Sequence, residues 1–403
     1  MKGFIGEDFL LTTEAARRLY HEHAEKMPIF DYHCHLNPAE IYENKQFSDI
    51  GEAWLAGDHY KWRVMRANAV PEEYVTGSAS FRDKFNRFAE VMPGLIGNPI
   101  YHWSHLELKR FFGIDELLSS KTADMVWETA NAKLQSPAGA ARALIQESNV
   151  RALCTTDDPV DDLNYHRMLA KEEGFATRVL PTFRPEKALN IVDPNYPAYL
   201  QKLGAASGIY IRTIDDVKQA LAQRIEYFAG VDCRLSDHSF GSPDFTVWDE
   251  SAAEEAMRKA LAGEQLLDYE VAAYQSYMMD FLGEQYADRG WAMQMHMGAI
   301  RNLNSKLYRA LGADVGGDAI GDVISAASLA ALLDRLATRG KLPRTILYTL
   351  NAADNDKLIA TAGCFQDETT AGKIQFGSAW WFNDHYDGMT AQLKSLANIG
   401  VLS

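Results

Sequence analysis

Cysteine is scarce in this chain of 403 residues, and no two cysteines form a Cys-x-x-Cys pair. The four thiols are widely scattered, at Cys34, Cys154, Cys233 and Cys364. This spacing argues against a disulfide framework and is typical of reduced, mostly buried thiols. We therefore expect a cytoplasmic protein.

Long apolar runs and basic stripes are also missing. No run of about 18 apolar residues occurs, and Glu7 and Asp8 interrupt the segment where a secretory signal needs an apolar core. The formal charge is −15, from 40 basic and 55 acidic side chains. We expect no export, no nucleic-acid partner and no membrane partner. An anionic small substrate would need local arginines.

Repeats, low-complexity segments and Pro/Ser-rich linkers do not occur, and no Gly-x-Gly-x-x-Gly turn follows the first predicted strand. A dinucleotide-binding fold is therefore disfavoured. Apolar residues make up 47% of the chain, which is enough to fill a large core. We expect residues 1–403 to form one domain.

Apolar runs that alternate with amphipathic segments are what the sequence does contain. Strands are predicted at 28–33, 151–156, 177–182, 231–236, 291–296, 344–350 and 373–376. Helices are predicted at 214–229, 252–263, 268–288, 323–339 and 386–398. This alternation predicts an α/β fold, a distorted (β/α)8 TIM barrel. The first connection, about 37–150, is too long for a loop and predicts a helical insertion over the barrel mouth.

The segment Phe30-Asp31-Tyr32-His33-Cys34-His35 ends the first predicted strand with two histidines. Side chains alternate along a strand, so His33 and His35 point the same way and could share a metal ion. Barrel enzymes keep their chemistry at this end of the strands. A structural histidine pair remains the alternative.

Five sequence blocks carry a family resemblance. They are Asp31-Tyr32-His33-Cys34-His35-Leu36, Gly57-Asp58-His59-Tyr60-Lys61-Trp62-Arg63, Ile96-Gly97-Asn98-Pro99 with Tyr101-His102-Trp103, Thr155-Thr156-Asp157-Asp158-Pro159, and Gly377-Ser378-Ala379-Trp380-Trp381-Phe382-Asn383-Asp384. From about residue 5 onward the chain resembles uronate isomerase, also called glucuronate isomerase, of the amidohydrolase superfamily.

This resemblance implies an aldose-ketose isomerisation in hexuronate catabolism: D-glucuronate to D-fructuronate, and D-galacturonate to D-tagaturonate. It implies a distorted (β/α)8 barrel and one divalent metal ion, most commonly Zn²⁺. His33 and His35 would bind this ion, together with an aspartate at the end of an eighth strand.

The eighth strand and its Asp-Ser-Arg cluster are expected just where the sequence stops, at Ser403. Either the sequence is part of a longer chain, or the gene product ends here and is destabilised or inactive. We expect the first, because the strand and helix rhythm is intact up to that point. In the family this aspartate is also a leading candidate for the base.

Isomerisation needs a base and an acid at adjacent carbons and a group that holds the developing oxyanion. The resemblance favours site roles for His59 and Tyr60, with Tyr60 bonding or protonating a substrate oxygen. Simple aromatic packing is the alternative for both residues. Trp380 and Trp381 follow the seventh strand, and we expect one to line the sugar pocket and the other to pack.

Two arginines stand at predicted strand ends. Arg184 follows the third strand and Arg301 comes five residues after His296. A guanidinium matches a carboxylate bidentately, so one of them is expected to hold the uronate carboxylate. A surface salt bridge is the alternative.

Acidic residues and one histidine complete the expected site. His296 is expected to contact the metal or a substrate hydroxyl, with Asp237 orienting it or the substrate; a helix N-cap is the alternative for Asp237. For Asp157 and Asp158 we favour a helix start before Pro159, and a role in the site is the alternative.

Two other functions are alternatives. A metal-dependent hydrolase of the same superfamily is disfavoured, because the fourth and sixth strands end in Ser236-Asp237-His238 and Thr349-Leu350-Asn351, without a lysine or a second histidine pair. An inactive truncated remnant is motivated only by the missing strand. A small hexuronate is the expected partner, and a homo-oligomer is compatible with the sequence.

Overall fold

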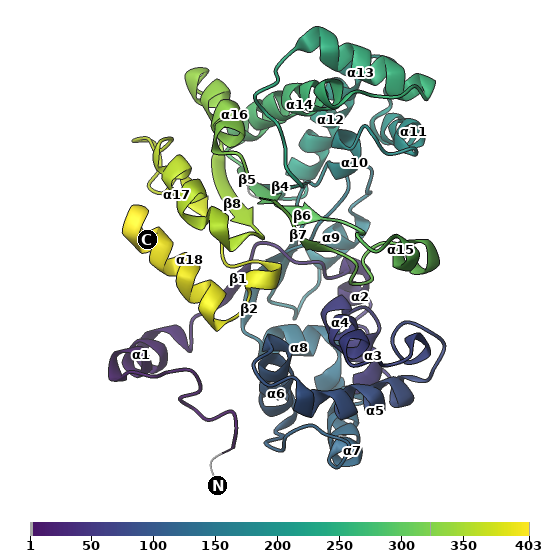
Figure 1. Ribbon diagram of the computed structural model, residues 1–403, viewed down its shortest axis with the longest axis vertical. Coiled ribbons are helices and arrows are strands. Elements are labelled where there is room, and N and C mark those ends of the chain that lie inside the picture. Colours follow the sequence, from purple (N-terminus) through teal and green to yellow (C-terminus); the bar gives the residue numbers. More distant parts are fainter. Residues whose placement is uncertain (1–2, 323, 403) are drawn as a thin grey trace.

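The computed structural model describes residues 3–322 and 324–402. Val323, the first residue of the helix predicted at 323–339, lies outside the described residues, as do Met1, Lys2 and Ser403. A row of parallel strands forms the centre of the molecule (Figure 1). In sequence order they are β1 (Ile29–Asp31), β2 (Val150–Cys154), β3 (Arg178–Leu180), β4 (Leu235–Phe240), β5 (Ala292–Met297), β8 (Arg344–Thr349) and β9 (Ile374–Phe376). All seven lie at or next to a predicted strand.

The strands pair as β1-β2-β3 and β4-β5-β8-β9. Parallel bridges from Phe183 to Asp157 and to Ser236 join the two sheets into one row. Consecutive parallel strands in this order, each pair linked through helices, are the arrangement of an α/β barrel.

The prediction of the fourth strand at 231–236 is wrong by about four residues. Val231 and Asp232 still belong to the turn after α12 (Ile214–Ala229), where Asp232 adopts a left-handed φ of 62°. The strand therefore begins at Leu235, and Asp237 and His238 lie within it. Because faces alternate along a strand, Asp237 and His238 point to opposite sides of the sheet.

Helices cover the outer face of the sheet (Figure 1). They are α9 (Asn164–Leu169), α10 (Glu186–Leu189), α11 (Tyr196–Ser207), α12, α13 (Glu250–Ala262), α14 (Asp268–Asp288), α16 (Ala326–Thr338), α17 (Asn355–Gly363) and α18 (Tyr386–Ile399). The predicted ranges of α12 and α14 match their observed bounds. Thr213 and Asp216 form a capping box that fixes the start of α12.

The connection between β1 and β2 is helical. It contains α2 (Pro38–Tyr42), α3 (Ile50–Leu55), α4 (His59–Ala67), α5 (Phe81–Val91), α6 (Pro99–Phe112), α7 (Ala123–Leu134) and α8 (Ala141–Glu147). Helices α3 to α7 share an apolar core of their own, around Trp54, Phe85 and Phe88. They form the lower lobe in Figure 1.

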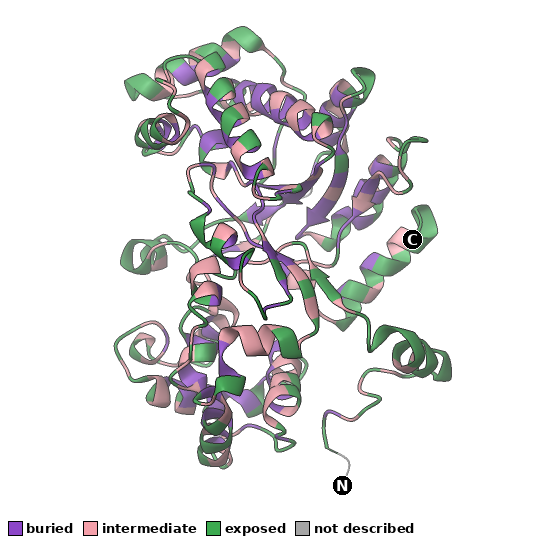
Figure 2. Ribbon diagram, turned by 180° about the vertical axis from the view of Figure 1, so that it is seen from behind, coloured by how far each residue is buried: buried purple, intermediate pink, exposed green. Residues whose placement is uncertain are grey.

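The barrel is open on one side. Within the described ranges no ladder joins β9 to β1, and the side chains of Ile29 and Phe30 in β1 are 45% and 65% exposed. Helix α18 and the N-terminal α1 (Glu14–Leu19) are largely exposed in Figure 2. Between β5 and α16 lie the short antiparallel pair β6 (Ala299–Ile300) and β7 (Ala319–Ile320), and α15 (Ser305–Leu311). No helix among the described residues is both long and apolar enough to span a membrane.

Candidate active site and metal centre

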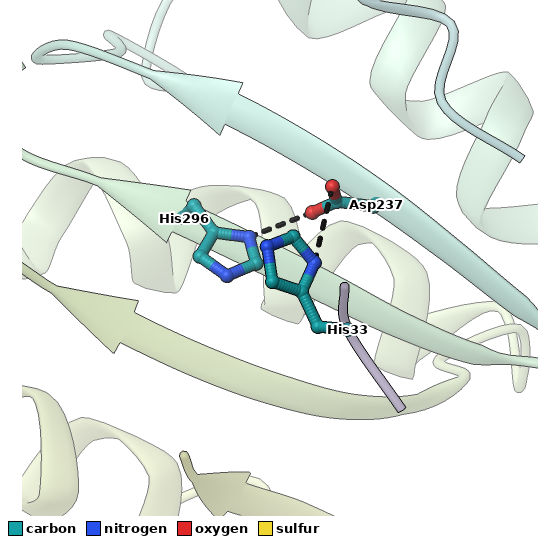
Figure 3. A group of neighbouring side chains, drawn as sticks. All are labelled: His33, Asp237 and His296. Carbon is teal, nitrogen blue, oxygen red and sulfur yellow. Dashed lines mark hydrogen bonds and ion pairs between the residues drawn. The ribbon is translucent and has the colours of Figure 1, made fainter. Parts of the chain in front are cut away.

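Three side chains from different strands meet inside the row of strands. His33 follows β1, Asp237 lies in β4 and His296 lies in β5 (Figure 3). His296 Nδ1 lies 2.6 Å from Asp237 Oδ1, and His33 Nδ1 lies 3.6 Å from Asp237 Oδ2. One potential ligand atom from each residue lies within 4.8 Å of the other two. We call these three residues the His-Asp-His triad.

The unsatisfied atoms of the triad fit a cation. His33 Nδ1 and His296 Nε2 are buried and have no hydrogen-bond partner among the described residues, and Asp237 Oδ2 accepts no hydrogen bond from them but lies 3.3 Å from Arg184 Nη1. While His296 Nδ1–H donates to Asp237, Asp237 orients the ring and Nε2 keeps the lone pair that can bind a metal ion, an arrangement common around zinc. Asp237 would itself bind the ion only if a metal bond replaced this hydrogen bond. Two imidazole nitrogens and a carboxylate oxygen are suitable ligands for a divalent ion.

The electrostatics around His33 and Asp237 favour the protonation states that bind a metal ion. Burial lowers the pKa of His33 to about 3, although the Asp237 charge acts in the opposite direction. Burial alone would raise the pKa of Asp237, but His296, Arg184 and His33 outweigh it and hold this pKa well below its usual range. His33 is therefore neutral and Asp237 ionised near neutral pH.

His35 lies beside the triad but is not part of it. Its ring centroid is 5.1 Å from that of His33, and its Nδ1 lies 3.0 Å from the hydroxyl of Thr156. Burial lowers the pKa of His35. The Nδ1 hydrogen bond leaves Nε2 as the second ring atom that could reach a ligand.

Arg184 lies against the triad. Its Nη1 is 3.3 Å from Asp237 Oδ2, and its Nη2 is 3.0 Å from Glu186 Oε2 at the start of α10. Its side chain is 19% exposed. Arg184 is a cation held by two carboxylates at the edge of the site.

Two residues at the site escaped the sequence analysis. Tyr348 in β8 pairs in register with His296 and stacks on its ring, with centroids 4.2 Å apart and planes 5° apart. The Tyr348 hydroxyl donates to Gln294 Oε1 over 2.9 Å, and Gln294 Nε2 donates to the carbonyl of Tyr32 over 3.0 Å. The alternation of side chains along β5 could have predicted Gln294, because residues 294 and 296 point to the same face of the strand.

His59 and Tyr60 occupy the first turn of α4, in the helical insertion. The Asp58 side chain accepts from the backbone N–H groups of Tyr60 and Lys61 and thereby fixes the start of this helix. The rings of His59 and Tyr60 stack with centroids 4.8 Å apart, and Trp381 meets His59 edge-on at 5.6 Å. Burial raises the pKa of Tyr60, so its hydroxyl stays protonated.

The two tryptophans have different surroundings. Trp380 meets the His296 ring at 4.6 Å, whereas Trp381 is buried against Ala299 and Leu350 beside His59 and Tyr60. Trp380 therefore borders the triad. The Trp380 and Trp381 rings are 6.0 Å apart and connect the triad to the aromatic residues of α4.

Arg301 lies farther out than Arg184. Its Nη1 is 2.7 Å from Asp318 Oδ2, and its guanidinium lies 5.1 Å from the Trp381 ring. Arg63 of α4 donates to the Asp318 carbonyl over 2.6 Å. These contacts fasten α4 to the segment that follows β6.

The interpretation of Asp157 and Asp158 as a helix start is wrong. The next helix, α9, begins only at Asn164, and Asp158 accepts from the N–H of Val160 in a turn. Asp157 is buried, where it accepts from the Thr155 hydroxyl over 2.7 Å. The same hydroxyl lies 2.7 Å from His166 Nε2. Asp-Asp-Pro thus marks a turn over a buried polar cluster.

This cluster makes stability depend on pH. Burial raises the pKa of Asp157 to about 7, although hydrogen bonds from Thr155 and Thr182 act in the opposite direction. Between about pH 4 and 7 the unfolded chain releases a proton that the folded chain keeps, so rising pH costs stability. Asp157→Asn should remove this contribution, so that between pH 5 and 7.5 the free energy of unfolding of the variant falls less, or rises more, with pH than that of the wild type, as measured by urea titration. Parallel profiles for the variant and the wild type would contradict this reading.

Parallel strands in barrel order, with a buried His-Asp-His triad inside them, define an α/β-barrel enzyme with a candidate metal centre. The family model described as glucuronate isomerase matches residues 1–403, and the chain belongs to this family.

Curated relatives that match the full length of this chain are named uronate isomerase. A uronate isomerase from Caldanaerobacter subterraneus subsp. tengcongensis is 51% identical over 402 residues, covering 100% of this chain and 86% of the relative. One from Bacillus licheniformis is 50% identical over 403 residues, covering 100% and 85%. The crystal structure of uronate isomerase from Thermotoga maritima superposes with a TM-score of 0.92 at 38% identity, covering 98% of this chain and 85% of that one.

Proposed function

We propose that this uronate isomerase interconverts D-glucuronate with D-fructuronate, and D-galacturonate with D-tagaturonate, at the His-Asp-His triad. The single observation that carries the assignment to this site is the meeting of His33, Asp237 and His296 at one buried point. The full-length match to the glucuronate isomerase family supports the reaction class.

We propose that His33 would hold a divalent ion, Zn²⁺. His35, Asp237 and His296 lie beside it and are the candidates for the further ligands. When bound, such an ion would polarise a carbonyl or stabilise negative charge on a substrate oxygen. The neutral imidazole of His33 and the ionised carboxylate of Asp237 suit this role at neutral pH.

The reaction moves a proton from C2 of the aldose to C1 through an enediol-like intermediate, while carbonyl and hydroxyl exchange places. We propose that Tyr60, protonated because burial raises its pKa, donates to a substrate oxygen. His59 stacks on Tyr60 and keeps its orientation. Asp237 orients His296, which contacts the metal or a substrate hydroxyl. Trp380, at the triad, lines the sugar pocket, while Trp381 packs behind it.

Incubation with D-glucuronate or D-galacturonate and Zn²⁺, followed by ¹³C NMR, tests this function. A ketone carbon should appear at C2 and the aldehyde or hemiacetal carbon at C1 should disappear. Cleavage of a lactone or amide substrate without any ketose would favour a hydrolase instead.

The substrate carboxylate is proposed to lie against Arg184, with Arg301 as the second candidate. Because a guanidinium favours a carboxylate over a neutral group, Arg184→Met should raise KM for D-glucuronate about 10- to 100-fold. KM for D-glucose, tested as a neutral analogue, should change much less. Arg309→Met, in an exposed part of α15, is the matched control. Equal losses on both substrates would assign Arg184 a structural role.

The domain organisation is also a proposal: one barrel domain over residues 1–403 with the helical insertion at about 37–150. We propose that an eighth parallel strand fills the open side between β9 and β1, where Ile29 and Phe30 are exposed. Fusing the C-terminal segment of the Caldanaerobacter relative to the 403-residue chain should raise its melting temperature. An unchanged melting temperature would contradict an eighth strand at this seam. The free cysteines suit the cytoplasm, which we propose as its location.

A further inference from the structure

A cavity of about 300 Å³ lies at the carboxyl ends of β4 and β5, outside the triad itself. Its wall includes Glu186 and Asn190 near α10, Ser239 of β4, Gln275 of α14 and Arg301 after β6. A volume of about 300 Å³ is at the lower end of the range for small-molecule sites. The cavity can therefore hold part of a sugar.

The cavity lies beside the triad. Ser239 follows Asp237 by two residues in β4, so both side chains share a face and lie about 6.6 Å apart along the strand. Ser239 also pairs in register with His296. On the other side, Arg184 contacts both Asp237 and Glu186, and Glu186 lines the cavity. Arg184 therefore links the triad to the wall of the cavity.

The cavity offers neutral hydrogen-bonding groups. The side chains of Asn190, Ser239, Ser242 and Gln275 make no hydrogen bond to any described residue. Its two charged groups are already paired, Glu186 with Arg184 and Arg301 with Asp318. Free amides and hydroxyls beside neutralised charges suit sugar hydroxyls better than an anion.

We propose that this cavity binds the C4 and C5 hydroxyls of the uronate, and that Asn190 and Gln275 set the preference between the two C4 epimers. This inference rests on the proposed function. With C1 and C2 at the triad and the carboxylate against Arg184, the intervening hydroxyls turn toward the cavity. D-glucuronate and D-galacturonate differ only in the configuration at C4. Amide groups that hydrogen-bond one configuration leave the other unpaired, which is an effective basis for discrimination.

The double variant Asn190→Ala with Gln275→Ala tests this assignment in the Zn²⁺-loaded protein. The kcat/KM for each uronate is measured, and the ratio of the two values should change about tenfold, the effect of losing one or two hydrogen bonds. Neither side chain makes a hydrogen bond within the described protein, so the fold should be retained. The two single variants should each give part of the shift.

Gln201→Ala is the matched control, because Gln201 is an exposed amide on α11 away from the cavity. Its epimer ratio should equal that of the wild type. An unchanged ratio in the double variant, or equal losses on both uronates, would overturn the inference and leave the isomerase function standing. Absence of ketose from either uronate with the wild-type protein would overturn the proposed function and this inference with it.

Discussion

Replacing His33 and His35 together by asparagine is expected to abolish stoichiometric binding of Zn²⁺ and to reduce isomerisation at least a thousandfold. Asparagine keeps approximate size and polarity but removes the imidazole lone pairs that would bind the ion. His33 supplies a buried, unpartnered Nδ1 to the triad, and His35 lies directly beside it. Metal content after gel filtration and ketose formation are the two measurements.

His23→Asn is the matched control, since this histidine lies in the N-terminal helical segment with a side chain that is 73% exposed. It should keep its metal and its activity. Retention of one Zn²⁺ per chain in the double variant would place the metal elsewhere. Comparison of the single variants then shows whether His35 is a ligand or only a neighbour of the triad.

Asp237→Asn is expected to have the second large effect, a loss of activity of about 100- to 10,000-fold. The substitution keeps the shape of the side chain and removes the charge. It thereby removes the charged acceptor for His296 and the ion-pair partner of Arg184, which lie 2.6 and 3.3 Å away. The charge that lies 3.6 Å from His33 Nδ1 is lost as well. Activity is measured with both uronates.

The folding of this variant is checked separately by circular dichroism and thermal melting. Asp334→Asn, on the exposed face of α16, controls for the loss of one negative charge. A folded Asp237→Asn protein with activity within threefold of the wild type would show that the carboxylate is dispensable. The roles proposed for Asp237 and His296 would then both be wrong.

Much of the fold followed from local pattern. The periods of two and 3.6 residues predicted the positions of the strands and of helices such as α12 and α14, because each element buries one face. The start of a strand after a turn was harder to predict. The left-handed Asp232 delays β4 until Leu235, and this displacement moves Asp237 from a loop into the strand.

Part of the candidate site could be predicted from the sequence. The spacing of two histidines singled out His33, and its place at a strand end singled out His296, but their meeting with Asp237 depends on three strands that are far apart in the sequence. Tyr348 and Gln294 were not predicted, because residues of a largely apolar strand are expected to pack in the core. Only the register of β8 with β5 shows that Tyr348 lies beside His296. The buried pairing of Asp157 with Thr155 and His166 likewise depends on packing that no local pattern reveals.

The most direct test of the central claim is proton NMR of D-glucuronate in D₂O with the 403-residue protein and Zn²⁺. The account predicts ketose signals together with loss of the C2 proton, because that proton leaves C2 before C1 is protonated. A metal-loaded, folded protein that leaves the C2 proton in place and forms no ketose would contradict isomerisation at this site.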